Sequence, residues 1–209
     1  PTDIRLGKPM DLPSPMSESE ILDHLQALAE TNHCYKQFIG LGYHETILPS
    51  VIKRNILENP GWYTAYTPYQ AELAQGRLEA LLNYQTVITD LTGMELANAS
   101  LLDESTAAAE AMTMLYDIRS RAQKKDEVLH FFVDEQVLPQ TLSLLQTRST
   151  PLGIKLVVGD LSSTNLDTNF FGALVQYPGK YGAIPDLKGF KDRCEPHEIR
   201  IAVAADIMS

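Results

Sequence analysis

Hydrophobic residues in the first half of the chain recur at helical spacing. Ser17 and Glu20 form a capping-box pattern, which marks the start of a helix. The apolar residues that follow share one helical face: Ile21, Leu22, Leu25 and Leu28. A second series over residues 71–92 has the same period and stops at Gly93, a residue type that often ends helices. Residues 1–16 contain four prolines and no period, so we expect an extended arm that lies on another surface.

A short helix is predicted between these two. Gly40 and Gly42 interrupt the chain, and apolar residues then recur at helical spacing over residues 48–56. The sequence Asn59-Pro-Gly61 is expected to stop this helix, because proline disfavours the helical conformation of the residue before it.

From about residue 100 the pattern changes to alternating helices and strands. Residues 127–133 form a continuous apolar run bounded by charges, as in a parallel strand covered on both faces. Further strands are predicted at 154–158, 171–176 and 199–204, and helices after Asp103, at 139–147 and at 185–194. Such alternation is typical of an α/β fold with right-handed crossovers. We therefore expect an N-terminal arm and helical segment at 1–95 and the first part of an α/β domain at 96–209.

Composition and charge exclude several classes of protein. With 44% hydrophobic residues, 209 residues can bury a substantial core. The excess of 27 acidic over 17 basic residues gives a net charge of −10, which disfavours nucleic acid and anionic membranes as partners. No apolar run approaches the roughly 20 residues that span a bilayer.

The cysteines and the last residues of the chain add two expectations. Cys34 and Cys194 are far apart and lack metal-ligand spacing, which favours free thiols in a reducing, cytoplasmic compartment over a structural disulfide. Residues 198–209 read as a buried strand that continues into apolar sequence. We therefore expect a fragment of a longer protein, truncated within the α/β domain.

Tyrosines concentrate around a Thr-Pro turn at residues 63–70. Pro68 holds Thr67 in an extended conformation, and the neighbouring phenols of Tyr66 and Tyr69 are suited to bind a carboxylate or to close over a flat cofactor. The alternative is that these amphipathic rings pack at a subunit or arm interface.

The start of the helix after Asp103 allows two interpretations. Free amides at a helix N-terminus attract phosphate, and Ser105 and Thr106 lie there. Asp103 and Glu104, however, place two carboxylates at the same terminus, where they compensate the helix dipole and repel a dianion. A structural cap is the better interpretation.

Long segments of the chain resemble a known family. Tyr63–Gln70, Gln75–Gln85 and Ala97–Ala111, together with shorter motifs such as Gly40–Tyr43 and Gln176–Pro178, resemble the N-terminal half of the glycine cleavage system P-protein, glycine dehydrogenase (decarboxylating). The resemblance covers nearly the whole chain. It implies a partial pyridoxal-phosphate-dependent fold-type I domain, aminotransferase-like, with an N-terminal helical arm.

The resemblance also implies an activity and partners. The parent enzyme decarboxylates glycine and transfers the aminomethyl group to the lipoyl arm of the H-protein, with pyridoxal phosphate as cofactor. The implied partners are a second, lysine-bearing half or subunit of the P-protein, the lipoylated H-protein, glycine and further copies in a homo-oligomer.

Site residues are implied in the same way. The cleft formed with the partner half is expected to be lined by Tyr66, Thr67, Tyr69, Gln70, Ser105 and Thr106. Asp206 follows a strand where fold-type I enzymes place the carboxylate that pairs with the pyridinium nitrogen, so it is either a vestige of that site or a buried turn cap. Leu138 stands where the family commonly has a histidine.

No lysine of the chain fits the Schiff-base position, which the resemblance assigns to the second half or to a separate subunit. We therefore expect no catalytic residue and no bound pyridoxal phosphate in this chain. No metal site is expected either, because the histidines lack ligand spacing: His24, His33, His44, His130 and His197. Two alternatives remain: a non-catalytic scaffold or assembly subunit, and another fold-type I enzyme such as an aminotransferase or a selenocysteine-lyase-like protein.

Overall fold

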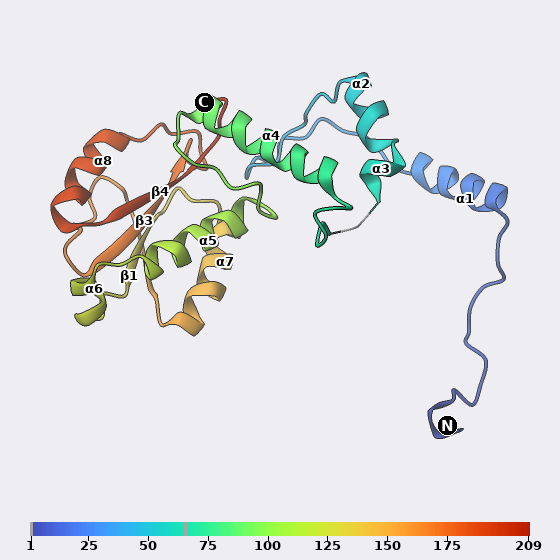
Figure 1. The fold of residues 1–209 in the computed structure, drawn as a ribbon, viewed down its shortest axis with the longest axis horizontal. Coiled ribbons are helices and arrows are strands. Elements are labelled where there is room, and N and C mark those ends of the chain that lie inside the picture. Colours follow the sequence, from blue (N-terminus) through green and yellow to red (C-terminus); the bar gives the residue numbers. More distant parts are fainter. Residues whose placement is uncertain (1, 65–66) are drawn as a thin grey trace. The chain divides into compact units, whose positions relative to one another are not determined.

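The computed structural model describes residues 2–64 and 67–209 (Figure 1). Tyr66, one of the predicted cleft residues, lies outside the described residues. The chain divides into two compact units, Pro1–Phe38 and Ile39–Ser209. The predicted domain boundary at residue 95 falls inside the second unit and stays a prediction.

The first unit contains a 3-10 turn, Thr2–Ile4, and helix α1, Glu18–Glu30. The predicted capping box is confirmed: the Ser17 amide donates to Glu20 Oε2 at 2.7 Å, and the Glu20 amide donates to Ser17 Oγ at 3.4 Å. The apolar stripe of α1 stays exposed, with Leu22 at 59%. The helix is thus specified by its own cap, while its apolar face has no cover within the unit.

The second unit begins with short helices and then one long helix. The predicted helix near residue 52 is confirmed as α2, Ser50–Ile52, which continues into a π-helical turn, η2, Lys53–Leu57. Helix α3, Pro60–Tyr63, was not predicted: Asn59 caps it by accepting from the Gly61 amide at 2.9 Å. Helix α4, Gln75–Thr92, starts later than predicted because residues 71–74 form a turn, and it ends as predicted at Gly93, where φ is 69°.

A four-stranded parallel sheet follows, in the order β2-β1-β3-β4. Its elements are α5 Glu104–Asp117, α6 Arg121–Lys125, β1 His130–Asp134, α7 Pro139–Ser149, η3 Thr150–Leu152, β2 Lys155–Gly159, β3 Phe170–Tyr177, α8 Leu187–Cys194, η4 Glu195–His197 and β4 Arg200–Ala205. The predicted α/β alternation is confirmed. Residues 93–103 connect α4 to α5 and form no strand.

Helices cover both faces of the sheet. Phe131 and Val133 of β1 belong to a core with α5 and α7, whereas Phe132 belongs to a second core with α8. All three side chains have 0% exposure. Figure 1 shows α8 on one face and α5 and α7 on the other. The prediction of a strand covered on both faces is therefore confirmed.

A bulge between β1 and β3 requires glycine. The register shifts after His130, so that Gly172 lies opposite Phe131. A Cβ atom at Gly172 would lie 2.9 Å from Phe131 Cε2 and 3.2 Å from Leu115 Cδ1. Any side chain at this position would displace the aromatic core.

We expect Gly172→Ala to destabilise the chain by about 1–3 kcal/mol, because it overpacks the core. Urea unfolding followed by circular dichroism measures the change in free energy. The control is Gly76→Ala in α4, where nothing lies within 4 Å of the added Cβ. This control removes a helical glycine and is expected to be neutral or stabilising by up to roughly 1 kcal/mol. Equal stabilities of the two variants would contradict the packing argument.

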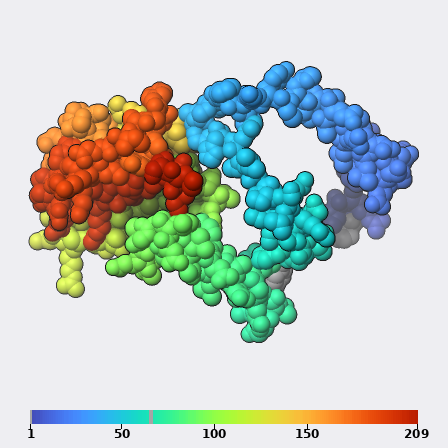
Figure 2. Space-filling view, turned by 90° about the horizontal axis from the view of Figure 1, so that it is seen from above, coloured from blue at the N-terminus to red at the C-terminus, as the bar shows by residue number. Residues whose placement is uncertain are grey.

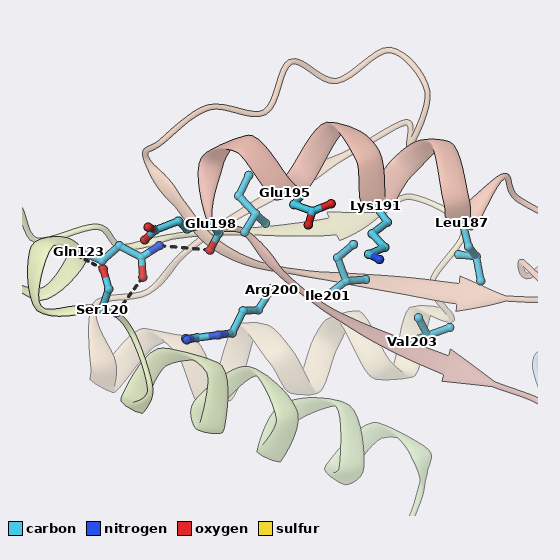
Figure 3. A pocket seen from close by; sticks show the side chains of 10 residues that line it. Ser120, Gln123, Leu187, Lys191, Glu195, Glu198, Arg200, Ile201 and Val203 are labelled. Atoms are coloured by element: carbon cyan, nitrogen blue, oxygen red, sulfur yellow. Dashed lines mark hydrogen bonds between the residues drawn. The ribbon is translucent and has the colours of Figure 1, made fainter. Parts of the chain in front are cut away.

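The outer side of β4 is open. A cavity of about 720 Å³ lies there between α8, α6 and the strand. Figure 3 shows charged side chains of α8 and β4, such as Lys191 and Arg200, beside apolar Ile201 and Val203. Val203 is 42% exposed. An open strand edge with apolar side chains is a surface that pairs with further polypeptide.

The isolated chain is therefore expected to self-associate, most simply as a dimer, through β4. Sedimentation velocity over a concentration series measures this. Val203→Lys should shift the equilibrium towards monomer, because a lysine on an edge strand opposes pairing. Val51→Lys, at a position 63% exposed on α2, should leave it unchanged. A monomer at high concentration, or an effect of the α2 variant alone, would sink this prediction.

Candidate functional site

A cavity of about 730 Å³ lies at the carboxyl ends of β3 and β4, beside the N-terminus of α5. In a parallel α/β sheet, this edge is where ligands bind. The cavity is lined by polar, charged and apolar residues that include Gly42, His44, Glu104, Leu138, Gln176, Lys180 and Asp206. The last residues of the chain, dark red in Figure 2, lie at the surface.

The N-terminus of α5 is capped by the chain's own carboxylates. Asp103 is the N-cap, and its Oδ1 accepts from the Thr106 amide at 2.7 Å. Hydrogen bonds from the side chain and amide of Thr106 hold the pKa of Asp103 below its ordinary value, so the carboxyl is ionised at neutral pH. The structure thus favours the cap over an anion site at this terminus.

A buried glutamine ties this terminus to the sheet. Gln176 on β3 is 7% exposed, and its Nε2 donates to Glu104 Oε1 at 3.0 Å and to the Ala204 carbonyl at 3.3 Å. Sequence reasoning gave Gln176 no role. The available signal was a lone amide at the end of an otherwise apolar strand.

The turn at residues 40–43 packs against the same helix end. Gln140 Nε2 on α7 donates to the Leu41 carbonyl at 2.8 Å. Gly42 has a φ of 83°, and a Cβ atom there would lie 3.0 Å from Leu138 Cδ1 and 3.6 Å from Glu104 Oε2. The turn therefore covers the first turn of α5 and uses glycine because both space and backbone conformation demand it.

The predicted cleft residues on α5 point to packing roles. Ser105 Oγ hydrogen-bonds Thr141 Oγ1 of α7 at 3.0 Å, and the Thr106 amide is used by the Asp103 cap. Neither residue lines the cavity that contains Gln176 and Asp206. Their role in lining a cleft stays a prediction.

The predicted cleft residues before α4 lie on the surface. Tyr69 is 83% exposed, and Thr67 and Gln70 are exposed as well. The Gln70 carbonyl accepts from the Leu73 and Ala74 amides at 3.2 and 3.1 Å. The structure does not bring these residues into the cavity at the sheet edge.

Asp206 lines that cavity and is exposed, so the burial assumed in the turn-cap alternative is wrong. Its Oδ1 accepts from the Met208 amide at 2.9 Å, and its amide donates to the Tyr177 carbonyl at 2.9 Å. Asp206 thus caps the turn after β4. A vestigial cofactor role stays a prediction.

Comparisons with known proteins fit this geometry. The family model of the glycine cleavage system P-protein matches residues 1–209. The chain belongs to this family. It is similar to glycine dehydrogenase (decarboxylating) of Christiangramia forsetii, Flavobacterium johnsoniae and Synechocystis, with 62%, 60% and 50% identity over all 209 residues. It spans 22%, 22% and 21% of the lengths of these relatives.

A solved P-protein has the same fold. The crystal structure of glycine decarboxylase (P-protein) of the glycine cleavage system, in inhibitor-bound form, is 31% identical with a TM-score of 0.84. The match covers 100% of this chain and 47% of that chain. The family and the fold-type I class expected from the sequence are confirmed. Another fold-type I family, such as the aminotransferases, is set aside.

The described residues contain neither a membrane-spanning helix nor a metal-binding cluster. Within residues 2–64 and 67–209, no helix is long and apolar enough to cross a bilayer. Across the same ranges, no group of three or more histidine, cysteine or acidic side chains is arranged to bind a metal ion.

The residues at the sheet edge do not fit a phosphate-bearing cofactor such as pyridoxal phosphate. The Thr106 amide already donates to Asp103 Oδ1, and Glu104 adds a second carboxylate at the helix terminus. Both repel a dianion at the place where the fold would hold the phosphate. Lys180 lines the cavity, but its Nζ donates to the Glu135 carbonyl at 2.7 Å.

We therefore expect no stable attachment of pyridoxal phosphate to this chain. After incubation with the cofactor and dialysis, the absorbance band of a lysine-bound cofactor should be absent. Mass spectrometry after borohydride reduction should find no pyridoxyl group on Lys180. Lys180→Arg is the matched control, and the complete P-protein is the positive control. A persistent band that disappears in the Lys180 variant would contradict the misfit.

Proposed function

We propose that this chain is part of the glycine decarboxylase of the glycine cleavage system. The observation that carries the proposal is the family match over residues 1–209, supported by 62% identity to a glycine dehydrogenase (decarboxylating) and by the TM-score of 0.84 to a solved P-protein. The reaction is the decarboxylation of glycine with transfer of the aminomethyl group to the lipoyl arm of the H-protein.

In this proposal the chain forms one wall of the cleft and another part of the P-protein holds the cofactor. The support is the misfit at α5, where Asp103 and Glu104 exclude a phosphate. The lysine that binds pyridoxal phosphate belongs to a second half or subunit of the P-protein. This chain alone is then inactive, and its contribution is to bind and orient substrate.

Residues 67–70 are the part of the chain best suited to that contribution. The phenol of Tyr69 is 83% exposed, so it is free to contact a surface supplied by another polypeptide. A phenol O–H donates a hydrogen bond to a carboxylate such as that of glycine. Tyr66, Thr67 and Gln70 join this wall on sequence grounds.

Ser105 and Thr106 join the wall on sequence grounds as well, and both also make contacts at the start of α5. Ser105 fastens α5 to α7 through Thr141, and Thr106 holds the Asp103 cap. Removing either contact would shift the first turn of α5, against which the turn at residues 40–43 packs.

We also propose a reducing, cytoplasmic location and assembly with the H-protein and further P-protein copies. Cys34 and Cys194 are both free. Burial raises the pKa of Cys194 to about 11, so its thiol is unreactive at neutral pH. Free thiols fit a compartment in which disulfides do not persist.

A second candidate function, a non-catalytic assembly subunit, is compatible with the same misfit at α5. The α5 terminus repels the phosphate that the fold type holds elsewhere. In that case the exposed tyrosines would only pack against a partner.

Tyrosine variants of the complete P-protein separate the two functions. Tyr69→Phe and Tyr66→Phe each remove one hydrogen bond to a charged group, worth roughly 1.5 to 3 kcal/mol. We expect about a tenfold to hundredfold fall in kcat/KM for glycine decarboxylation in at least one of them. Tyr181→Phe is the control, because Tyr181 has the same 83% exposure as Tyr69. Unchanged kinetics in both variants, with intact assembly, would leave the segment a structural role.

A further inference from the structure

Arg77 makes an unusual set of contacts near the start of α4. Its Nη2 donates to the Thr64 carbonyl at 2.6 Å, to the Gly61 carbonyl at 3.0 Å and to the Trp62 carbonyl at 3.3 Å. One half-buried guanidinium thus binds three main-chain oxygens of a segment 13 to 16 residues earlier in the chain.

These oxygens come from the end of α3, which has only four residues. The last carbonyls of a helix have no partner inside the helix, and a cation at this end is favourable. Asn59 caps the other end by accepting from the Gly61 amide, and Thr64 Oγ1 donates to the Pro60 carbonyl. Residues 59–64 therefore form one hydrogen-bonded turn, and the Arg77 guanidinium links this turn to α4.

The following residues return to the same place on α4. The Tyr69 amide donates to the Thr67 carbonyl at 2.8 Å, and the Gln70 carbonyl accepts from the Leu73 and Ala74 amides. Ala74 is 4% exposed and directly precedes α4. Both ends of the segment from Thr64 to Gln70 are thus anchored at the first turns of α4.

Nothing described in the chain holds the ring of Tyr69, which is 83% exposed. The region that the phenol can reach therefore depends on the position of the Tyr69 backbone, which lies between the two anchors. A catalytic group displaced by about 1 Å loses on the order of a hundredfold in rate. A contact that fixes this backbone matters for catalysis without touching substrate.

We propose that Arg77 is a positioning residue for glycine decarboxylation, which sets the location of Thr67–Gln70 through the carbonyls of Gly61, Trp62 and Thr64. The inference rests on the proposed function, in which that segment lines the cleft. All three bonds come from one nitrogen, Nη2, at the end of a side chain one bond longer than that of lysine, so a lysine ammonium in its place falls short of these carbonyls.

The test compares Arg77→Lys and Arg77→Ala in the complete P-protein. Both are expected to lower kcat/KM for glycine decarboxylation by about tenfold or more, because charged hydrogen bonds are lost. The loss should divide between kcat and KM as it does in Tyr69→Phe. Added methylguanidinium should partly restore Arg77→Ala, and methylammonium should not.

Arg148 supplies the matched control. It forms an exposed ion pair with Glu110, and such pairs contribute little. Arg148→Lys and Arg148→Ala should keep wild-type kinetics and should not respond to methylguanidinium. An equal loss in the Arg148 and Arg77 variants would overturn the positioning role.

A double variant tests whether Arg77 acts through Tyr69. If it does, Arg77→Lys combined with Tyr69→Phe should be no slower than the slower single variant. Fully additive losses would show that Arg77 acts elsewhere and would overturn the inference.

Hydrogen exchange separates failure of this inference from failure of the proposed function. Arg77→Ala should speed amide exchange in peptides covering residues 59–70 of the complete P-protein. Unchanged exchange there overturns the inference whatever the kinetics. Faster exchange with a loss in Tyr69→Phe but wild-type kinetics in Arg77→Ala overturns the inference alone. Wild-type kinetics in both variants overturns the catalytic assignment of the segment, on which the inference rests.

Discussion

The close pairing of β1 with β3 is the constraint on which the rest of the fold depends. Phe131 and Phe132 point to opposite faces of the sheet and both are fully buried, so each face needs its own cover of helices. Gly172 allows β3 to approach Phe131 at the bulge. Parallel pairing then places the carboxyl ends of all four strands at one edge. The cavity beside α5 exists because of this arrangement.

Electrostatics at that edge decide which chemistry the chain supports. A helix N-terminus at the carboxyl ends of parallel strands is a general anion site. Here Asp103 and Glu104 neutralise it, and Gln176 holds the Glu104 carboxylate in place from β3. The helix terminus that binds a phosphate in other proteins of this fold is here capped by the chain's own carboxylates. This cap supports the proposal that the chain contributes a cleft wall while another part of the P-protein holds the cofactor.

The segment before the sheet buries few residues, in contrast to the sheet and its covering helices. Over the described residues up to 102, Ala74 alone is buried. Many large apolar side chains are exposed there, among them Leu82 at 63%. Local caps hold its helices instead: Ser17 and Glu20 at α1, and Asn59 and Arg77 at α3. Such a segment keeps its local shape while presenting apolar surface, which suits a chain that spans about a fifth of the length of its relatives.

The sequence by itself determined the local elements and the family. The Ser17–Glu20 capping box, the stop at Gly93 and the cap at Asp103 were all predictable, because each depends on hydrogen bonds within a few residues. The covered strand at β1 was predictable because burial on both faces leaves a continuous apolar run. The family was recognised from long contiguous motifs, because matching a motif requires only the sequence and not the contacts between distant residues.

Only the tertiary structure decided the contacts between distant residues. The hydrogen bond from Gln176 to Glu104 joins residues 72 positions apart, and the hydrogen bond from Arg77 to the Gly61 carbonyl joins residues 16 positions apart. It also showed that Asp206 is exposed. Periodicity reports which face of an element is apolar, but it does not report which polar group that element meets. Hydrogen bonds between elements depend on register and crossover, and these are fixed only when the sheet packs.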